Sequence, residues 1–169
     1  RAPDCFEIEE TLRTRMPIPV FHDDQHGTAI IVGAAVLNGL ELKGRKIEDV
    51  KICVSGAGAA AIACLNVLVA LGARHENIWV ADKEGLVTHK RNDVNDKWRG
   101  QYRRQSDATT LAEVIEGADI FLGLSGPGAL KPEMLAKMAP KPLILALANP
   151  NPEISPELAK ATRPDAMIC

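Results

Sequence analysis

The residues best suited to chemistry lie where an apolar, β-prone run meets a pair of glycines, in Ile52-Cys53-Val54-Ser55-Gly56-Ala57-Gly58-Ala59-Ala60-Ala61. Gly56 permits a tight strand-to-helix turn, Gly58 removes the side chain where backbone must approach a pyrophosphate, and Ala61 is the third small position, at which helix packs on strand. The helix that follows presents unpaired N–H groups and a positive dipole end to phosphates. We therefore predict a dinucleotide-binding turn, with Gly56, Ala57, Gly58, Ala59 and Ala60 contacting the cofactor.

A carboxylate at the end of the next predicted strand supports this interpretation. The hexapeptide alone also describes a small-residue turn packed for steric reasons. However, a second predicted strand, residues 77–81, ends in Asp82. Asp82 follows Ala61 by about 20 residues, the usual distance to the carboxylate that binds the adenosine ribose. Strand, glycine turn, helix, strand and carboxylate together predict a nicotinamide dinucleotide site.

The choice between NAD and NADP stays open at this end of the site. Asp82 would accept a hydrogen bond from a ribose 2′-OH and would repel a 2′-phosphate. Lys83, its neighbour, would offset that repulsion, as would Arg91 if it lies near. The alternative role for Lys83 is a solvated surface charge.

Two adjacent carboxylates, Asp23 and Asp24, precede a predicted helix start in the run 21–28. In one interpretation, one of them caps the helix and the other is solvated. In the other, one ligates a hard divalent cation, Mg²⁺ or Mn²⁺, which prefers oxygen ligands. Zinc is disfavoured, because the two nearby histidines are not part of an H-E-x-x-H pattern.

Asn149 follows an apolar strand and precedes a proline. It is either a turn-forming residue or the donor of an amide hydrogen bond to a substrate carboxylate or a nicotinamide ribose. Gly56, Asp82, Ser125 and Asn149 all follow predicted strands. Ligands of parallel sheets bind beyond the carboxyl ends of strands, so we expect these residues to form a single site.

The elements that must position these residues alternate between strand and helix. The strands are short, continuous apolar runs, which predicts an α/β fold: a doubly wound, Rossmann-type parallel sheet with helices on both faces. The helix over 28–40 is apolar nearly all round and is expected to be buried. Residues 88–107 are polar and are expected to form an exposed loop or mobile hairpin. Further elements are expected as helices over 6–15, 59–71, 111–116 and 132–138 and from about 156, an extended run over 18–21, and strands over 119–124, 143–148 and 166–169.

Composition narrows the classes of function. With 169 residues and 46% hydrophobic content, the chain fits one folded domain. A net charge of −2 without a long basic run argues against nucleic acid or an anionic membrane as partner. The longest mostly apolar stretch, 28–40, is too short to span a bilayer. We expect a cytoplasmic homo-oligomer, and we expect the scattered cysteines to be unpaired in a reducing compartment and to hold no metal: Cys5, Cys53, Cys64 and Cys169.

Three motifs resemble those of the malic enzymes, in the version typical of the bacterial NADP-dependent type. They are Phe-His-Asp-Asp-Gln-His-Gly-Thr-Ala at 21–29, Val-Ser-Gly-Ala-Gly-Ala-Ala at 54–60 and Leu-Ala-Asn-Pro at 147–150. Their order and spacing fit over essentially the whole chain. The resemblance implies oxidative decarboxylation of malate to pyruvate and CO₂ with reduction of NADP or NAD, assisted by Mg²⁺ or Mn²⁺ as a Lewis acid.

The resemblance also implies roles for single residues. Asp24 matches a metal ligand of the family, and Asp23 matches its neighbour, which helps to orient a catalytic lysine. Thr28 would lie near the cofactor, and Asn149 would contact both substrate and nicotinamide.

By the same resemblance, residues 1–169 are expected to be the NAD(P)-binding domain of a longer malic enzyme. The family's tyrosine acid, lysine base and remaining metal ligands would lie before Arg1, and a further substrate asparagine after Cys169. Tyr102, the only tyrosine, lies in the polar region and is not assigned the acid role. These residues alone are therefore expected to be inactive. Two rival functions stay open: a metal-independent hydroxy- or amino-acid dehydrogenase, and a non-catalytic nucleotide-sensing module.

Overall fold

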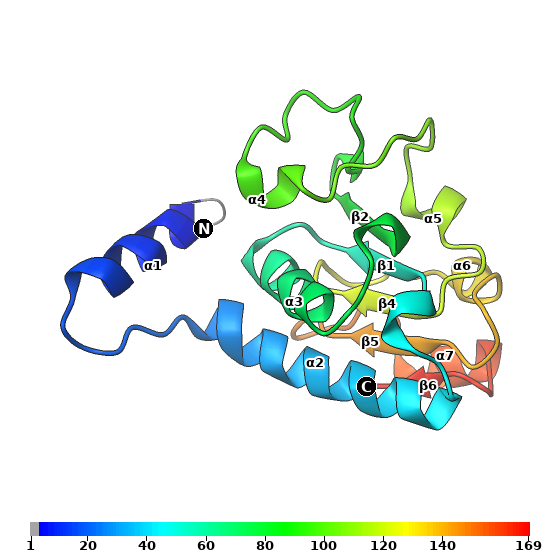
Figure 1. Cartoon of the computed structure of the whole chain (residues 1–169). Helices are drawn as coiled ribbons and strands as arrows, with labels where there is room; N and C mark the ends of the chain where they lie inside the picture. Colours follow the sequence, from blue (N-terminus) through cyan, green and yellow to red (C-terminus); the bar gives the residue numbers. More distant parts are fainter. Residues whose placement is uncertain (1–3) are drawn as a thin grey trace.

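A six-stranded sheet forms the centre of the molecule in the computed structural model, which describes residues 4–169 (Figure 1). The strand order is β3-β2-β1-β4-β5-β6, and every neighbouring pair is parallel except β2–β3. The strands are β1 (Ile52–Ser55), β2 (Ile78–Asp82), β3 (Gly85–Leu86), β4 (Ile120–Gly123), β5 (Leu143–Ala146) and β6 (Met167–Ile168).

Helices connect the strands and cover the two faces of the sheet. They are α1 (Asp4–Arg15), α2 (Asp23–Lys43), α3 (Ala59–Ala70), α4 (Lys97–Gly100), α5 (Leu111–Val114), α6 (Pro132–Leu135) and α7 (Pro156–Thr162), with short 3-10 turns η1 (Ile47–Asp49) and η2 (His75–Asn77). The predicted doubly wound α/β fold is thereby confirmed.

Alternation along the strands divides the core into two layers. Ile52 and Val54 of β1 belong to the cluster that packs with α2 and α3. Cys53, between them, belongs to the other cluster, with residues of α5, α6 and α7. Successive side chains of a strand point to opposite faces, so a strand that is apolar throughout must be covered on both sides. All four residues of β1 are buried.

The edge of the sheet departs from the prediction of a purely parallel arrangement. β3 runs antiparallel to β2, with Ala81 opposite Leu86 and Asp82 opposite Gly85. Gly85 adopts φ +106°, a backbone conformation that side chains disfavour. The tight reversal after Asp82 thus adds a short hairpin where the sequence indicated only a transition into a polar region.

Helix α2 corrects one expectation. It begins at Asp23 and ends at Lys43, before Gly44 in the left-handed conformation, and it packs on α3. One of its faces is buried, but Ile30, Ile31 and Leu42 are 62%, 69% and 77% exposed. The expectation of a fully buried helix is therefore wrong for these residues, because the sheet and α3 cover only one side of α2.

The polar region after β3 also differs from its expected form, an exposed loop or mobile hairpin. Residues 88–107 contain helix α4 and two nearly inaccessible side chains, Val94 and Tyr102. The Tyr102 hydroxyl donates to Asn66 Oδ1 of α3 at 2.8 Å. Trp98 stacks on Phe6 of α1 with ring centroids 5.1 Å apart. The segment is therefore packed against the domain, because its few apolar side chains insert between α1, α3 and β2.

The N-terminal part of the described chain consists of helix α1 and a connection to α2. Helix α1 extends the predicted helix toward the N-terminus, and residues 16–22 run to α2 without helix or strand (Figure 1).

Cys53 and Cys64 are buried and unpaired, as predicted. Among residues 4–169, no helix is long and apolar enough to cross a membrane.

Candidate functional site

The glycine turn follows β1 at the carboxyl edge of the sheet. Gly56 has φ +119°, and its N–H donates to the carbonyl of Ala81 at 2.7 Å. A Cβ at this position would lie 2.4 Å from the carbonyl oxygen of Leu124. The fold itself therefore requires glycine here, because both the dihedral angle and the closeness of another strand's backbone exclude a side chain.

Gly58 is glycine for a different reason. It caps α3 with φ −84° and ψ −171°, which any residue can adopt, and no atom lies within 4 Å of a Cβ built on it. The first turn of α3 contains no acidic residue, and its leading amides have no intrahelical acceptor. The turn is thus an open cradle with N–H groups, and its shape and polarity suit the pyrophosphate of a dinucleotide. Ala57 is buried beneath it, and Ala59 and Ala60 are half-buried at its rim.

The loops after β1 and β4 meet beside this cradle. The hydroxyl oxygens of Ser55 and Ser125 are 2.7 Å apart, and the Leu124 N–H donates to the carbonyl of Ser55 at 2.8 Å. Ser125 itself is exposed. The structure therefore places Ser125 next to the glycine turn, as the argument from strand ends predicted.

Glu153 belongs to the same edge, and the sequence reasoning missed it. It follows the Asn-Pro-Asn-Pro run after β5, and its side chain is fully buried. Its carboxylate accepts hydrogen bonds from the N–H groups of Ser125 and Ala148, at 2.8 and 3.1 Å. The available signal was a lone carboxylate, beside Ile154, at the end of a proline-rich loop.

Asp82, at the end of β2, forms a bidentate ion pair with Arg91. Two guanidinium nitrogens donate to its carboxylate at 2.6 and 3.0 Å, and the side chains are 16% and 12% exposed. Arg91 also binds Asp93, and this hydrogen bond is the main reason why the pKa of Asp93 falls to about 2. Lys83 is 87% exposed and lies 3.4 Å from Glu84, so it is the solvated cation and Arg91 is the one that reaches Asp82.

The acidic pair opens helix α2. His22 is the N-cap residue and no side chain caps the helix, so the alternative in which Asp23 or Asp24 caps it is wrong; both lie in the first turn. The Asp24 side chain is 82% exposed and 3.7 Å from His22. The Asp23 carboxylate occupies the space that a side chain on Gly27 would fill, 2.1 Å from its Cβ position.

The start of α2 faces the end of β5. Asp23, Thr28 and Leu147 line one open cavity of about 540 Å³, together with other residues of α2. Within residues 4–169, no group of three or more His, Cys, Asp or Glu side chains converges in a way that could hold a metal ion. Asp24 is thus a single available oxygen ligand, and the described residues do not form a complete metal site.

Asn149 lies just beyond β5, exposed, and is joined to Pro150 by a cis peptide bond. Its side chain forms no hydrogen bond to any other part of the chain that the structure describes, so the turn-stabilising alternative has no support. The parallel, adjacent strands β2, β1, β4 and β5 bring Asp82, Gly56, Ser125 and Asn149 to the same edge of the sheet.

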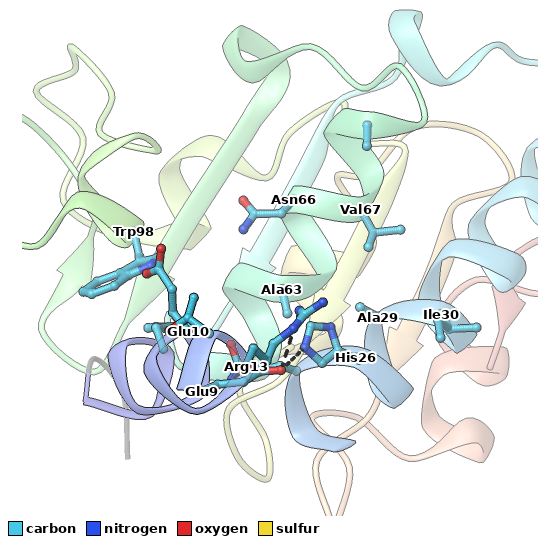
Figure 2. A pocket seen from close by; sticks show the side chains of 14 residues that line it. Glu9, Glu10, Arg13, His26, Ala29, Ile30, Ala63, Asn66, Val67 and Trp98 are labelled. Carbon is cyan, nitrogen blue, oxygen red and sulfur yellow. Dashed lines mark hydrogen bonds and ion pairs between the residues drawn. The ribbon is translucent and has the colours of Figure 1, made fainter. Parts of the chain in front are cut away.

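A further cavity, of about 610 Å³, lies elsewhere, between α1, α2 and α3 (Figure 2). Figure 2 shows Arg13 and His26 turned toward Glu9, whose carboxylate is 2.5 Å from His26 Nε2. The Gln25 amide donates to the other oxygen of Glu9 at 2.7 Å. These polar groups are partnered with one another, and none of the predicted cofactor, catalytic or metal residues lines this cavity.

Comparison with known proteins gives a consistent result. A family model described as "Malic enzyme, NAD binding domain" matches residues 25–167. The chain is 67% identical to the NAD-dependent malic enzyme of Rhizobium meliloti and 59% identical to the NADP-dependent malic enzyme of Escherichia coli, in each case over all of the chain and 22% of the relative. It thus spans about a fifth of the length of these curated relatives.

Solved structures agree. The crystal structure of an NAD-dependent malic enzyme from Thermotoga maritima superposes with a TM-score of 0.86 at 43% identity, over 96% of this chain and 44% of that one. A glutamate dehydrogenase from Thermus thermophilus, at 18% identity and a TM-score of 0.59, shares the fold alone.

Proposed function

The chain belongs to the malic enzyme family, and from that premise we propose that it is the nicotinamide dinucleotide-binding domain of an enzyme that converts malate to pyruvate and CO₂ while reducing NAD or NADP. The observation that carries this proposal is the cradle at Gly58. No atom lies within 4 Å of a Cβ built on this glycine, and the first turn of the helix that follows contains no acidic residue. Such a space suits a bound phosphate group and serves no packing role.

In this proposal, the residues at the sheet edge each hold one part of the cofactor. The amides at Gly58, Ala59 and Ala60 bind the pyrophosphate. Asp82 binds the adenosine ribose on one side of the turn. Ser125 and Asn149, beyond β4 and β5, face the nicotinamide half, and Thr28 approaches it from α2. A dinucleotide lying across the switch point between β1 and β4 would meet all of them in this order.

Arg91 is the residue that would admit NADP. An unpaired Asp82 would repel a 2′-phosphate, but Arg91, which also pairs with Asp93, offsets part of that charge and would present its guanidinium to the adenosine ribose. The Asp82 carboxylate still has acceptor capacity for a 2′-OH. We therefore propose that the domain binds NADP and can also bind NAD.

We further propose that Asp24 is one ligand of Mg²⁺ or Mn²⁺. An exposed carboxylate is a suitable hard oxygen donor, and the remaining ligands would come from outside residues 4–169. When bound, the cation would polarise the substrate oxygens as a Lewis acid. Asp23, which lies over Gly27, would orient the lysine base supplied by the rest of the enzyme, and Asn149 would donate its amide to the substrate carboxylate.

The exposed face of α2 supports the view that this domain works within a longer polypeptide. Ile30, Ile31 and Leu42 are exposed apolar side chains of this helix, and Ile30 and Ile31 line a cavity with Asp23 and Thr28. An apolar surface joined to an incomplete site suits a neighbouring domain that completes it. The relatives contain several times more polypeptide than this chain, so we propose that the rest of the same polypeptide covers it.

The proposal is tested on the full-length enzyme by malate-dependent reduction of NADP and NAD, with and without exhaustive chelation of metal. We expect reduction that stops on chelation and returns with Mg²⁺ or Mn²⁺. Reduction that persists without metal would favour a metal-independent dehydrogenase instead.

A further inference from the structure

Glu153 joins two loops of the candidate site through its two carboxylate oxygens. Oε1 accepts the N–H of Ser125, the second residue after β4, at 2.8 Å. Oε2 accepts the N–H of Ala148, the second residue after β5, at 3.1 Å. Glu153 has 0% exposure, so its carboxylate is shielded from bulk water. A single buried group thus fixes the spacing between the two strand ends.

The same group reaches the glycine turn indirectly. The Ser125 hydroxyl lies 3.4 Å from Glu153 Oε1 and 2.7 Å from the hydroxyl of Ser55, the residue before Gly56. The Glu153 carbonyl also accepts the N–H of Leu130 at 3.2 Å, which anchors its own backbone. The backbone of Glu153 is therefore anchored by Leu130, and its carboxylate is connected by hydrogen bonds to the residues that follow β4 and β5 and, through Ser125, to the end of β1.

The strand beside it leaves room for the carboxylate. A Cβ on Gly123, the last residue of β4, would lie 2.4 Å from Glu153 Cδ. Gly123 has no positive φ, so its backbone conformation is open to any residue. The absence of a side chain at 123 therefore serves the close approach of Glu153.

A carboxylate is the chemical group that this position needs. Both neighbouring groups are N–H donors, and a carboxylate can accept on both oxygens, whereas an amide would turn an NH₂ group toward one donor. Burying a carboxylate is costly, and within residues 4–169 its side-chain hydrogen bonds all come from uncharged donors. Packing alone does not explain such a residue in place of an apolar one.

We propose that Glu153 is a positioning residue: it holds the loops after β4 and β5 so that Ser125 and Asn149 meet the nicotinamide half of the bound dinucleotide. This inference rests on the proposed function. It assigns no contact between Glu153 and the cofactor. The carboxylate bonds directly to the loops after β4 and β5 and reaches the glycine turn only through the Ser125 and Ser55 hydroxyls, so we expect a much smaller effect on the pyrophosphate and adenosine subsites.

The test compares two ligands of the full-length enzyme by calorimetry. One is the oxidised dinucleotide that the wild-type enzyme binds, and the other is the corresponding ADP-ribose (2′-phosphorylated where the dinucleotide is NADP), which lacks the nicotinamide. For Glu153→Gln we expect about 10-fold weaker dinucleotide binding, the effect of one unsatisfied buried donor, and ADP-ribose binding within about 2-fold of wild type. Retained ADP-ribose binding also shows that the variant is folded.

Two further variants make the result specific. Glu157→Gln removes an exposed carboxylate of α7 and is expected to change neither affinity. Gly123→Ala, which displaces the Glu153 carboxylate without altering it, is expected to reproduce the selective loss. Equal losses for both ligands, or no loss in either Glu153→Gln or Gly123→Ala, would overturn the inference. A wild-type enzyme that binds neither ligand would instead refute the proposed function.

Discussion

The guanidinium of Arg91 donates two hydrogen bonds to the Asp82 carboxylate, at 2.6 and 3.0 Å, at the end of β2. This pair offsets part of the charge of the acidic residue that would favour NAD, although Arg91 also pairs with Asp93. The curated relatives include both NAD-dependent and NADP-dependent malic enzymes.

For Arg91→Gln we therefore expect the KM for NADP to rise about 10-fold, because the 2′-phosphate then meets an uncompensated Asp82. The KM for NAD should change by much less. Steady-state kinetics with each cofactor measures both values. Lys90→Gln, a charge loss at an exposed side chain of the same segment, is the control; equal effects of the two substitutions would show that only general electrostatics is involved.

The two glycines of the turn should respond differently to alanine. Gly58→Ala enters open space at a permitted φ, so the free energy of unfolding should change by less than about 1 kcal/mol while dinucleotide affinity falls at least about 10-fold. Gly56→Ala should destabilise the domain by at least about 2 kcal/mol, because φ +119° and the Leu124 carbonyl both oppose a side chain. Thermal unfolding and calorimetry separate these effects. Unchanged dinucleotide affinity in Gly58→Ala would contradict the assignment of the cradle.

Asp24→Asn distinguishes an enzyme from a nucleotide sensor. The side chain is 82% exposed, so its loss should not affect folding, and its amide is a much poorer ligand for a hard cation. We expect malate turnover to fall at least about 100-fold, with the Kd for dinucleotide within about 2-fold of wild type. Retained turnover at saturating Mg²⁺ would remove Asp24 from the metal site.

The exposed face of α2 predicts protection in the complete protein. If the proposed neighbouring domain covers α2, a cysteine placed by Ile31→Cys should react with a maleimide at least about 10-fold more slowly than one placed by Leu158→Cys on α7. Peptide mapping by mass spectrometry identifies the labelled site. Equal labelling rates would mean that the α2 face stays exposed. In a second measurement, a photocrosslinker at position 31 should join two parts of one chain. A product of twice the chain mass would instead identify a second copy of the chain as the covering partner.

The buried thiols predict sensitivity to alkaline pH. Burial raises the pKa of Cys53 and of Cys64 from 9.0 to about 12. Above pH 9 the unfolded chain releases these protons and the folded chain keeps them, so stability falls as pH rises from 9 toward 12. Each thiol contributes about 1.4 kcal/mol per pH unit in that window. Tm measured against pH should therefore fall less steeply in Cys64→Ala than in the wild type, and parallel curves would refute this origin.

The sequence by itself determined the dinucleotide turn and the order of the main strands and helices, but not strand β3 and helix α4. Continuous apolar strands alternating with helices leave only a sheet covered on both faces, and glycines at 56 and 58 between a strand and a helix have few other uses. The resemblance in three motifs was enough to indicate the family. These are local patterns, so they can be interpreted without knowing which distant residues meet.

Only the tertiary structure decided which side chains become partners across long stretches of chain. It showed that Arg91, not Lys83, pairs with Asp82, and that His22 is the N-cap residue of α2, which removes the alternative of an aspartate cap. It also buried Glu153 beneath Ser125 and Ala148. Hydrogen bonds and burial at these positions depend on how β4 and β5, and the segment after β3, come together. That geometry follows from packing of the whole domain and is not encoded in the spacing of any one motif.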